Sequence, residues 1–224
     1  MRLNKNIRQT LRIAKIELSS MFYSPVAWLI LVIFALLIGY DYANIFDSQL
    51  HSQSLGNNLW SVSSAIYNSW MTGILKPILR NLYLYIPLIT MGLMSREYQS
   101  GSVKLLYSSP IKNSSIILGK YLAMMCYGAA LMSIIGLNVL FSWLTVENFQ
   151  ISMLLVGMLG IYLLILAYSA IGLFMSTLTA YQVVAAIGTL AVLAVLNFIG
   201  DVGQSIDFVR DITFWLSIYG RSTS

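Results

Sequence analysis

The sequence predicts an all-α integral membrane protein, with an N-terminal amphipathic helix at the membrane interface followed by five transmembrane helices. Hydrophobic residues make up 58% of the 224 residues and charged residues only 9%, whereas a soluble domain carries about 25% charged residues. Three long segments contain no charged side chain, namely residues 18–40, 121–146 and 148–200. Because a helix needs about 20 apolar residues to cross a bilayer, the last of these segments has room for two spans.

The first element is expected to be an amphipathic helix over residues 1–22, because its apolar and basic side chains fall on neighbouring faces. Such a helix suits the inner membrane surface, where anionic headgroups attract each basic side chain by about 1 kcal/mol. The alternative is a basic segment that only sets the membrane topology. Pro25 marks the point where the chain would turn into the membrane. The apolar face comprises Leu3, Ile7, Leu11, Ala14, Leu18 and Phe22, and the membrane-interface cations are Lys5, Arg8, Arg12 and Lys15.

Five apolar segments are expected to span the membrane. The second of them contains an apolar run, residues 82–94, that is too short alone. We expect it to extend back past Lys76 and Arg80, which lie four residues apart on one helix face. These two cations either anchor the helix in the headgroups or form a basic pair on the path of an anionic substrate. Pro87 is expected to kink this helix. The predicted spans are residues 25–45, 74–94, 121–144, 151–178 and 183–200.

The distribution of charge predicts which side of the membrane each loop occupies. With the N-terminus in the cytoplasm, nine of the 13 Lys and Arg residues lie inside, and six of the eight acidic residues lie outside. This is the asymmetry that membrane proteins show. Residues 95–120 are then a cytoplasmic segment, and residues 201–224 are external. Five spans leave the C-terminus outside, so we expect either an odd number of spans or a sixth span that this chain lacks.

The cytoplasmic segment, residues 95–120, is longer than a passive connector needs to be, and it contains the stretch REYQSGSVKLLYSSP, residues 96–110. Gly101 and Ser102 predict a tight turn. The following VKLLYSS predicts a short helix with apolar side chains facing the cytosol, and such side chains often mark a docking site. The segment is therefore either a docking element or a simple connector. The candidate docking residues are Arg96, Glu97, Gly101, Ser102, Val103, Lys104, Leu105, Leu106 and Pro110.

Three stretches of the chain together resemble the permease subunits of ABC-2 type transporters. They are FYSPVAWLILVIFALL, PLITMGLMSREYQSGSVKLLYSSPI and ILGKYLAMM, which begin at residues 22, 87 and 117. The strongest resemblance is to permeases associated with gliding motility in Bacteroidetes. Ser102 replaces the usual threonine of the family pattern, and Lys104 replaces a common acid. The residues that match the pattern are Glu97, Gly101, Leu105, Pro110, Gly119 and Lys120.

The resemblance implies a division of labour between subunits. A separate ATP-binding cassette ATPase would dock on the cytoplasmic segment, which would act as a coupling helix, and on the N-terminal helix. Glu97 would face a basic residue of that ATPase, and Leu105 and Leu106 would be the apolar anchors. A second permease, identical or different, would complete the transporter. Membrane lipids are a further expected partner, and nucleic acid is not expected. The family normally has six spans, and its members of this type lie in the bacterial inner membrane.

The sequence offers no catalytic or cofactor chemistry of its own. It lacks the G-x-x-x-x-G-K-[ST] pattern of an ATP site. The single cysteine, Cys126, permits no internal disulfide, and the single histidine, His51, is expected in a polar loop. We therefore expect no enzyme activity, no cofactor and no metal. The rival to a permease is a membrane scaffold, or a mechanical or regulatory anchor of a larger envelope complex.

Overall fold

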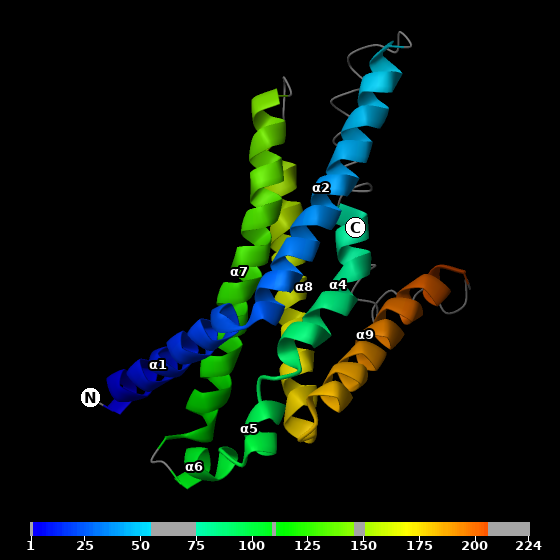
Figure 1. Ribbon diagram of the computed structural model, residues 1–224. Coiled ribbons are helices and arrows are strands. Elements are labelled where there is room, and N and C mark those ends of the chain that lie inside the picture. Colours follow the sequence, from blue (N-terminus) through cyan, green and yellow to red (C-terminus); the bar gives the residue numbers. More distant parts are fainter. Residues whose placement is uncertain (1, 55–74, 109–110, 146–150, 206–224) are drawn as a thin grey trace.

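A computed structural model of the protein describes residues 2–54, 75–108, 111–145 and 151–205 (Figure 1). All regular structure in these ranges is helical. The all-α prediction is therefore confirmed for the part of the chain that the structure describes. The helices are α1 (Arg2–Tyr23), α2 (Pro25–Ser54), α4 (Leu75–Thr90), α5 (Ser95–Ser100), α6 (Val103–Ser108), α7 (Asn113–Thr145), α8 (Ile151–Leu178) and α9 (Gln182–Ser205).

The long helices form a bundle, and the short helices gather at one end of it (Figure 1). Helix α1 lies against the first half of α7, and α4 packs against both α8 and α9. Helices α5 and α6 lie at the lower end of the molecule in this view, between the end of α4 and the start of α7. This end therefore brings together the N-terminal helix, the two short helices and the beginning of α7.

The core of the bundle lies between α2, α4, α7 and α8. It contains Phe34, Leu82, Tyr127 and Ile165, whose side chains are each at most 1% exposed. The Tyr127 hydroxyl donates a hydrogen bond of 2.8 Å to the carbonyl oxygen of Ala27, which ties α7 to α2. Bonds of this kind help to hold membrane helices together, because lipid tails are as apolar as the core side chains and supply little hydrophobic drive.

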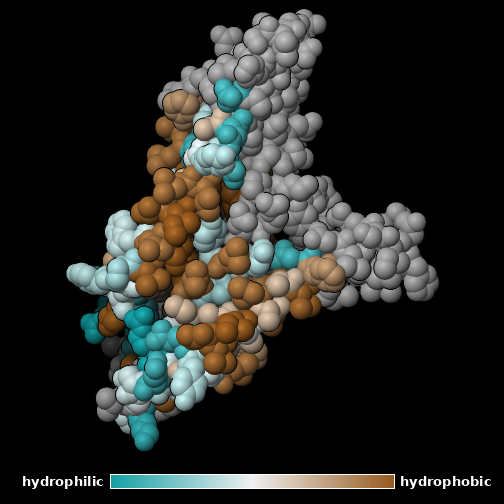
Figure 2. All heavy atoms as spheres, turned by 45° about the vertical axis from the view of Figure 1, so that its right-hand side comes forward, coloured by the Kyte–Doolittle hydropathy of each residue, from teal (hydrophilic) through white to brown (hydrophobic). Residues whose placement is uncertain are grey.

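Three of the described helices are long and apolar enough to cross a membrane. These segments are Pro25–Asn44, Asn113–Phe141 and Leu155–Leu178, and Gln182–Phe198 is a shorter apolar helix. They fall on the predicted first, third, fourth and fifth spans, although the total number of spans is not settled by them. Large hydrophobic side chains remain exposed along these helices, as expected for surfaces that face lipid. Figure 2 shows these side chains over the middle of the molecule and hydrophilic ones toward its lower end.

Several helix bounds differ from the predicted ones. Helix α2 continues to Ser54, so His51 lies within its last two turns and the prediction of a loop there is wrong. Helix α7 begins at Asn113, which places the last eight residues of the predicted cytoplasmic segment in its first turns. Helix α9 continues to Ser205. The fourth predicted span, residues 151–178, coincides with α8. Of the predicted external segment, residues 206–224 lie outside the described residues.

The predicted second span is shorter in the structure than in the prediction. Helix α4 ends at Thr90, and residues 91–94 form a turn instead of completing the span. The backbone N–H of Leu93 bonds to the oxygen of Thr90 at 3.1 Å, so the chain forms a tight turn over residues 90–93, which includes Gly92. The part of this helix that the structure describes, Leu75–Thr90, has 16 residues and is about 24 Å long. The side chains of Lys76 and Arg80 lie outside the described residues.

Candidate functional site

Lys120 occupies the centre of the junction between α1, α5 and α7. Its side chain is only 1% exposed, although it belongs to a class that is almost never fully buried without a partner. The ammonium nitrogen donates to Glu97 Oε1 at 2.7 Å and to the carbonyl oxygen of Leu93 at 2.6 Å. It also forms an ion pair with Glu17 Oε1. An ammonium has three donors, so these three acceptors satisfy it completely.

The three acceptors come from three separate segments of the chain. Glu17 lies on α1, Glu97 lies in the first turn of α5, and Leu93 lies in the turn that follows α4. A buried cation is tolerated only when it is paired and hydrogen-bonded, because removing it from water costs several kcal/mol. The position of Lys120 on α7 therefore requires all three segments to meet there. We call Glu17, Glu97 and Lys120 the junction cluster.

The junction cluster carries one more negative than positive group. The carboxylates of Glu17 and Glu97 are 20% and 23% exposed, so both reach the edge of the cluster. The second oxygen of Glu97, Oε2, is buried and has no hydrogen-bond partner among the described residues. The structure thus gives Glu97 a partner in its own chain, where the sequence suggested a basic residue on another subunit.

Gly119 allows α1 to approach α7 closely enough for this pairing. A Cβ atom at this position would lie 2.7 Å from Cγ2 of Ile13 and 3.0 Å from the carbonyl oxygen of Thr10. Real Cβ atoms essentially never approach other atoms within 3.0 Å, so a larger residue would push α1 away. Gly119 and Lys120 therefore act as a pair, in which the glycine permits the helix crossing and the lysine bonds across it.

The sequence contains a signal for this cluster in the placement of its few acidic residues. Glu17 and Glu97 are the only acidic residues among the segments assigned to the basic, cytoplasmic side. Lys120 is the last charged residue before a long apolar stretch. A lone lysine there, with only two acids on its side of the membrane, predicts an ion pair. The resemblance marked Gly119 and Lys120 as matching positions, but it did not assign them these contacts.

Ser176 on α8 holds the turn between α4 and α5 in place. Its hydroxyl oxygen accepts hydrogen bonds from the backbone N–H groups of Met94 at 3.0 Å and Ser95 at 3.1 Å. The same hydroxyl donates to the carbonyl oxygen of Met91 at 3.1 Å. Ser176 is buried, so water cannot easily replace it. Ser176 thus holds in place the turn whose Leu93 carbonyl oxygen accepts a hydrogen bond from Lys120.

We expect Ser176→Ala to lower the stability of the solubilised protein by about 1–3 kcal/mol, because it leaves two buried N–H groups unpaired. The measurement is the midpoint of thermal unfolding in mild detergent. Thr177→Ala is the control, because Thr177 is a neighbouring α8 residue whose hydroxyl bonds only to its own helix, at the Phe174 oxygen. Equal midpoints for the two variants would show that Ser176 does not hold the turn.

The segment that was expected to dock a partner forms two short helices. Gly101 separates α5 from α6 with a φ of 71°, a conformation that favours glycine, so the predicted turn and short helix are confirmed. Ser102 bonds to Ser100 through their hydroxyls at 2.8 Å, and the Lys104 side chain is exposed. The Val103 side chain is half-buried. The side chains of Leu105, Leu106 and Pro110 lie outside the described residues.

The predicted interfacial helix forms, although its packing differs from the expected pattern. Arg8, Arg12 and Lys15 are exposed on α1, as an interfacial role requires, and the Lys5 side chain lies outside the described residues. The face that contacts α7 includes Ile13, which is not among the residues of the predicted apolar face. Ile7 and Leu11 are each 56% exposed. Helix α1 thus has one apolar edge against α7 and a second edge free to face lipid.

A comparison with known protein families gives a match over most of the chain. Residues 11–206 match the family model described as ABC-2 family transporter protein. The matched range includes all of the junction cluster and every described helix except the first part of α1. Comparisons with curated proteins and with solved structures gave no match.

Proposed function

The chain belongs to the ABC-2 family of transporter proteins, and from this membership we propose that it is the membrane-spanning permease of an ATP-driven exporter. ATP hydrolysis in such a transporter takes place on separate subunits, so this chain supplies the path through the membrane. The proposed unit is a single transmembrane domain, residues 1–224, with its N-terminus in the cytoplasm of a bacterial cell. The placement of Lys and Arg residues supports this orientation.

The observation that supports this proposal best is the bonding of Lys120 to three segments at once. An ATPase that docks on α5 and α6 would move α5, which is joined through Glu97 to Lys120 on α7 and from there to Glu17 on α1. A movement of α5 and α6 would then be transmitted through Lys120 to α7 and to α1 together. In this proposal Glu97 acts within the chain, and the docking surface lies on the exposed side of α5 and α6.

Further features extend the proposal to partners and substrate. The transporter would contain two permeases, either two copies of this chain or one copy with a different permease, and two ATPase subunits. Exposed Arg8, Arg12 and Lys15 would hold α1 against anionic headgroups. Lys76 and Arg80 would lie toward the outer end of α4, as headgroup anchors or as contacts for an anionic substrate. The resemblance to gliding-motility permeases supports placing the exporter in that group.

We expect a charge change on α6 to release the ATPase subunit. The tagged full-length protein is purified in mild detergent from its native host, and the copurifying proteins are identified by mass spectrometry. The wild type should retain a protein that carries the ATP-binding G-x-x-x-x-G-K-[ST] motif. The variant Val103→Asp with Lys104→Glu should lose it, because both residues lie in the first turn of α6. Glu97→Lys is unsuitable here, because it would disrupt the junction cluster.

Lys112→Glu is the matched control, because it reverses an exposed charge in the same segment but outside α6. It should retain the ATPase. If the α6 variant keeps the ATPase as well as Lys112→Glu does, the docking surface is not on α6. If the well-folded wild type brings down no ATPase, the permease proposal fails and a membrane scaffold takes its place.

A further inference from the structure

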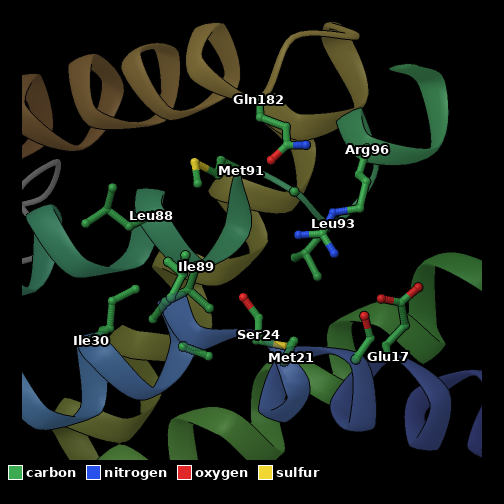
Figure 3. Close-up of a pocket in the computed structure, with 14 residues that line it drawn as sticks. Glu17, Met21, Ser24, Ile30, Leu88, Ile89, Met91, Leu93, Arg96 and Gln182 are labelled. Atoms are coloured by element: carbon green, nitrogen blue, oxygen red, sulfur yellow. The ribbon is translucent and has the colours of Figure 1, made fainter. Parts of the chain in front are cut away.

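A cavity of about 130 Å³ lies where the junction of α1 and α2 meets the turn after α4, the start of α5 and the start of α9 (Figure 3). For comparison, a protein cavity of about 150 Å³ can hold a molecule the size of benzene. The junction cluster borders this cavity, because Glu17 contributes to its wall.

One end of the cavity is polar and carries a cation. Arg96 and Gln182 reach it from α5 and α9, and Ser24 reaches it from the junction between α1 and α2 (Figure 3). Ser20 of α1 also lines the cavity. Arg96 forms no ion pair with any acidic side chain in the described residues. The Glu17 carboxylate is engaged by Lys120 through Oε1. Arg96 is therefore the cation at this end whose guanidinium is not engaged in an ion pair among the described residues, and a guanidinium suits the geometry of a phosphate group.

Gly92 makes room for this guanidinium. A Cβ at Gly92 would lie 3.3 Å from Nη2 of Arg96 and 3.6 Å from Oε1 of Gln182. A side chain at this position would crowd both groups. Because Gly92 has none, the ends of Arg96 and Gln182 can both lie close to the turn that follows α4.

The other end of the cavity is apolar and continues along two helices. Val26 and Leu88 line the cavity and are 45% exposed each. Ile33 lies seven residues after Val26, and Leu84 lies four residues before Leu88, so each shares a helix face with its partner. Both are also exposed, by 41% and 42%. An alkyl chain leaving the cavity would therefore meet apolar side chains on α2 and on α4.

The cavity also lies at the depth where headgroups are expected. It is located where α1, the proposed interfacial helix, gives way to the apolar segment Pro25–Asn44. Trp28, close by on α2, donates its indole N–H to the carbonyl oxygen of Phe22 at 2.8 Å while more than half exposed. Tryptophan concentrates at membrane–water interfaces, because its ring is apolar and its N–H is polar.

We propose that this cavity binds the phosphate-bearing headgroup of a membrane lipid, with Arg96 contacting the phosphate and the acyl chain lying along α2 and α4. The bound lipid would belong to the cytoplasmic leaflet, and this part of the proposal rests on the orientation given in the proposed function. The binding chemistry rests only on the cavity, on Arg96 and on the two apolar helix faces.

Native mass spectrometry of the full-length protein tests this proposal. The protein is released from detergent after incubation with phosphatidylglycerol, and the bound lipids are counted. The wild type should retain one lipid tightly. Arg96→Gln should bind it about tenfold more weakly, as the loss of a charge-assisted contact predicts. Ser20→Trp should also lose it, because Ser20 lines the cavity on the exposed side of α1 and a large ring there would fill the space.

Two matched controls separate a specific site from diffuse attraction. Lys112→Gln removes an exposed cation away from the cavity, and Ser19→Trp adds the same ring one position away from the cavity lining. Both should retain the lipid. Equal loss in Arg96→Gln and Lys112→Gln, or retention in Ser20→Trp, would overturn the proposal.

Two further measurements identify the source of the phosphate and keep this proposal separate from the proposed function. Phosphatidylglycerol should remain bound in the presence of millimolar inorganic phosphate. If inorganic phosphate alone binds with the same dependence on Arg96, the site is one for free phosphate and the lipid assignment is wrong. The lipid count is made without ATPase. If the protein copurifies with the ATPase but binds no lipid, only the lipid-site inference is wrong. If it binds the lipid but copurifies with no ATPase, only the permease proposal is wrong.

Discussion

Replacing Lys120 with methionine is expected to lower the stability of the protein by about 3 kcal/mol, because it leaves two carboxylates facing each other without their shared cation. Breaking a buried ion pair by removing one partner costs about 3–5 kcal/mol, and we take the lower end because Glu17 and Glu97 are each about one-fifth exposed. Methionine has a similar length and no charge, so little packing is lost. For a protein of this size the change corresponds to about 6–12 °C in the midpoint of thermal unfolding.

A neutral version of the junction cluster separates charge from packing. Lys120→Met combined with Glu17→Gln and Glu97→Gln removes all three charges, and it should recover a large part of the lost stability because no charge is then left buried. Glu17→Gln with Glu97→Gln, in the presence of Lys120, should be less stable than this triple variant. If the triple variant is no more stable than Lys120→Met alone, the effect comes from packing around the side chain, and the ion pairs do not stabilise the junction.

Replacing Gly119 with leucine is expected to displace α1 from α7 and to cost about 2–3 kcal/mol, the range for overpacking a tight contact. A Cβ there would already lie 2.8 Å from Cβ of Ile13 and 3.0 Å from the backbone oxygen of Thr10. The backbone oxygen can move only if the helix moves. Displacement of α1 would carry Glu17 away from Lys120, so the same variant should also weaken retention of the ATPase.

Gly39→Leu is the matched control, because a Cβ at Gly39 would meet nothing within 4 Å. It should leave the thermal midpoint unchanged or slightly raised, since leucine favours a helix more than glycine does. Gly119→Ala should show a smaller loss than Gly119→Leu, and Ile13→Ala should relieve part of that loss by removing the nearest side chain. Equal midpoints for Gly119→Leu and Gly39→Leu would show that the α1–α7 crossing tolerates a side chain.

The sequence predicted the helices better than it predicted their contacts. Span-length apolar runs without charge identified α2, α7 and α8, because an uncharged stretch of that length is rare outside a membrane. Gly101 identified the turn between α5 and α6, because a positive φ favours glycine. The second span was predicted to reach residue 94, but α4 ends at Thr90. That ending depends on Ser176 of α8, which bonds to the turn from 85 residues away in the chain.

The sequence by itself determined the class of this protein, its long apolar helices and the glycine turn between α5 and α6, because charge content, apolar length and glycine placement are local properties. Only the tertiary structure decided how α5 and the turn before it are held. Lys120 meets Glu17 across 103 residues and Glu97 across 23, and Arg96 turns toward a cavity that is lined from α1, α2, α4, α5 and α9. Contacts of this range follow from how close two helices can approach, and at Gly119 that distance is set by the absence of a single side chain.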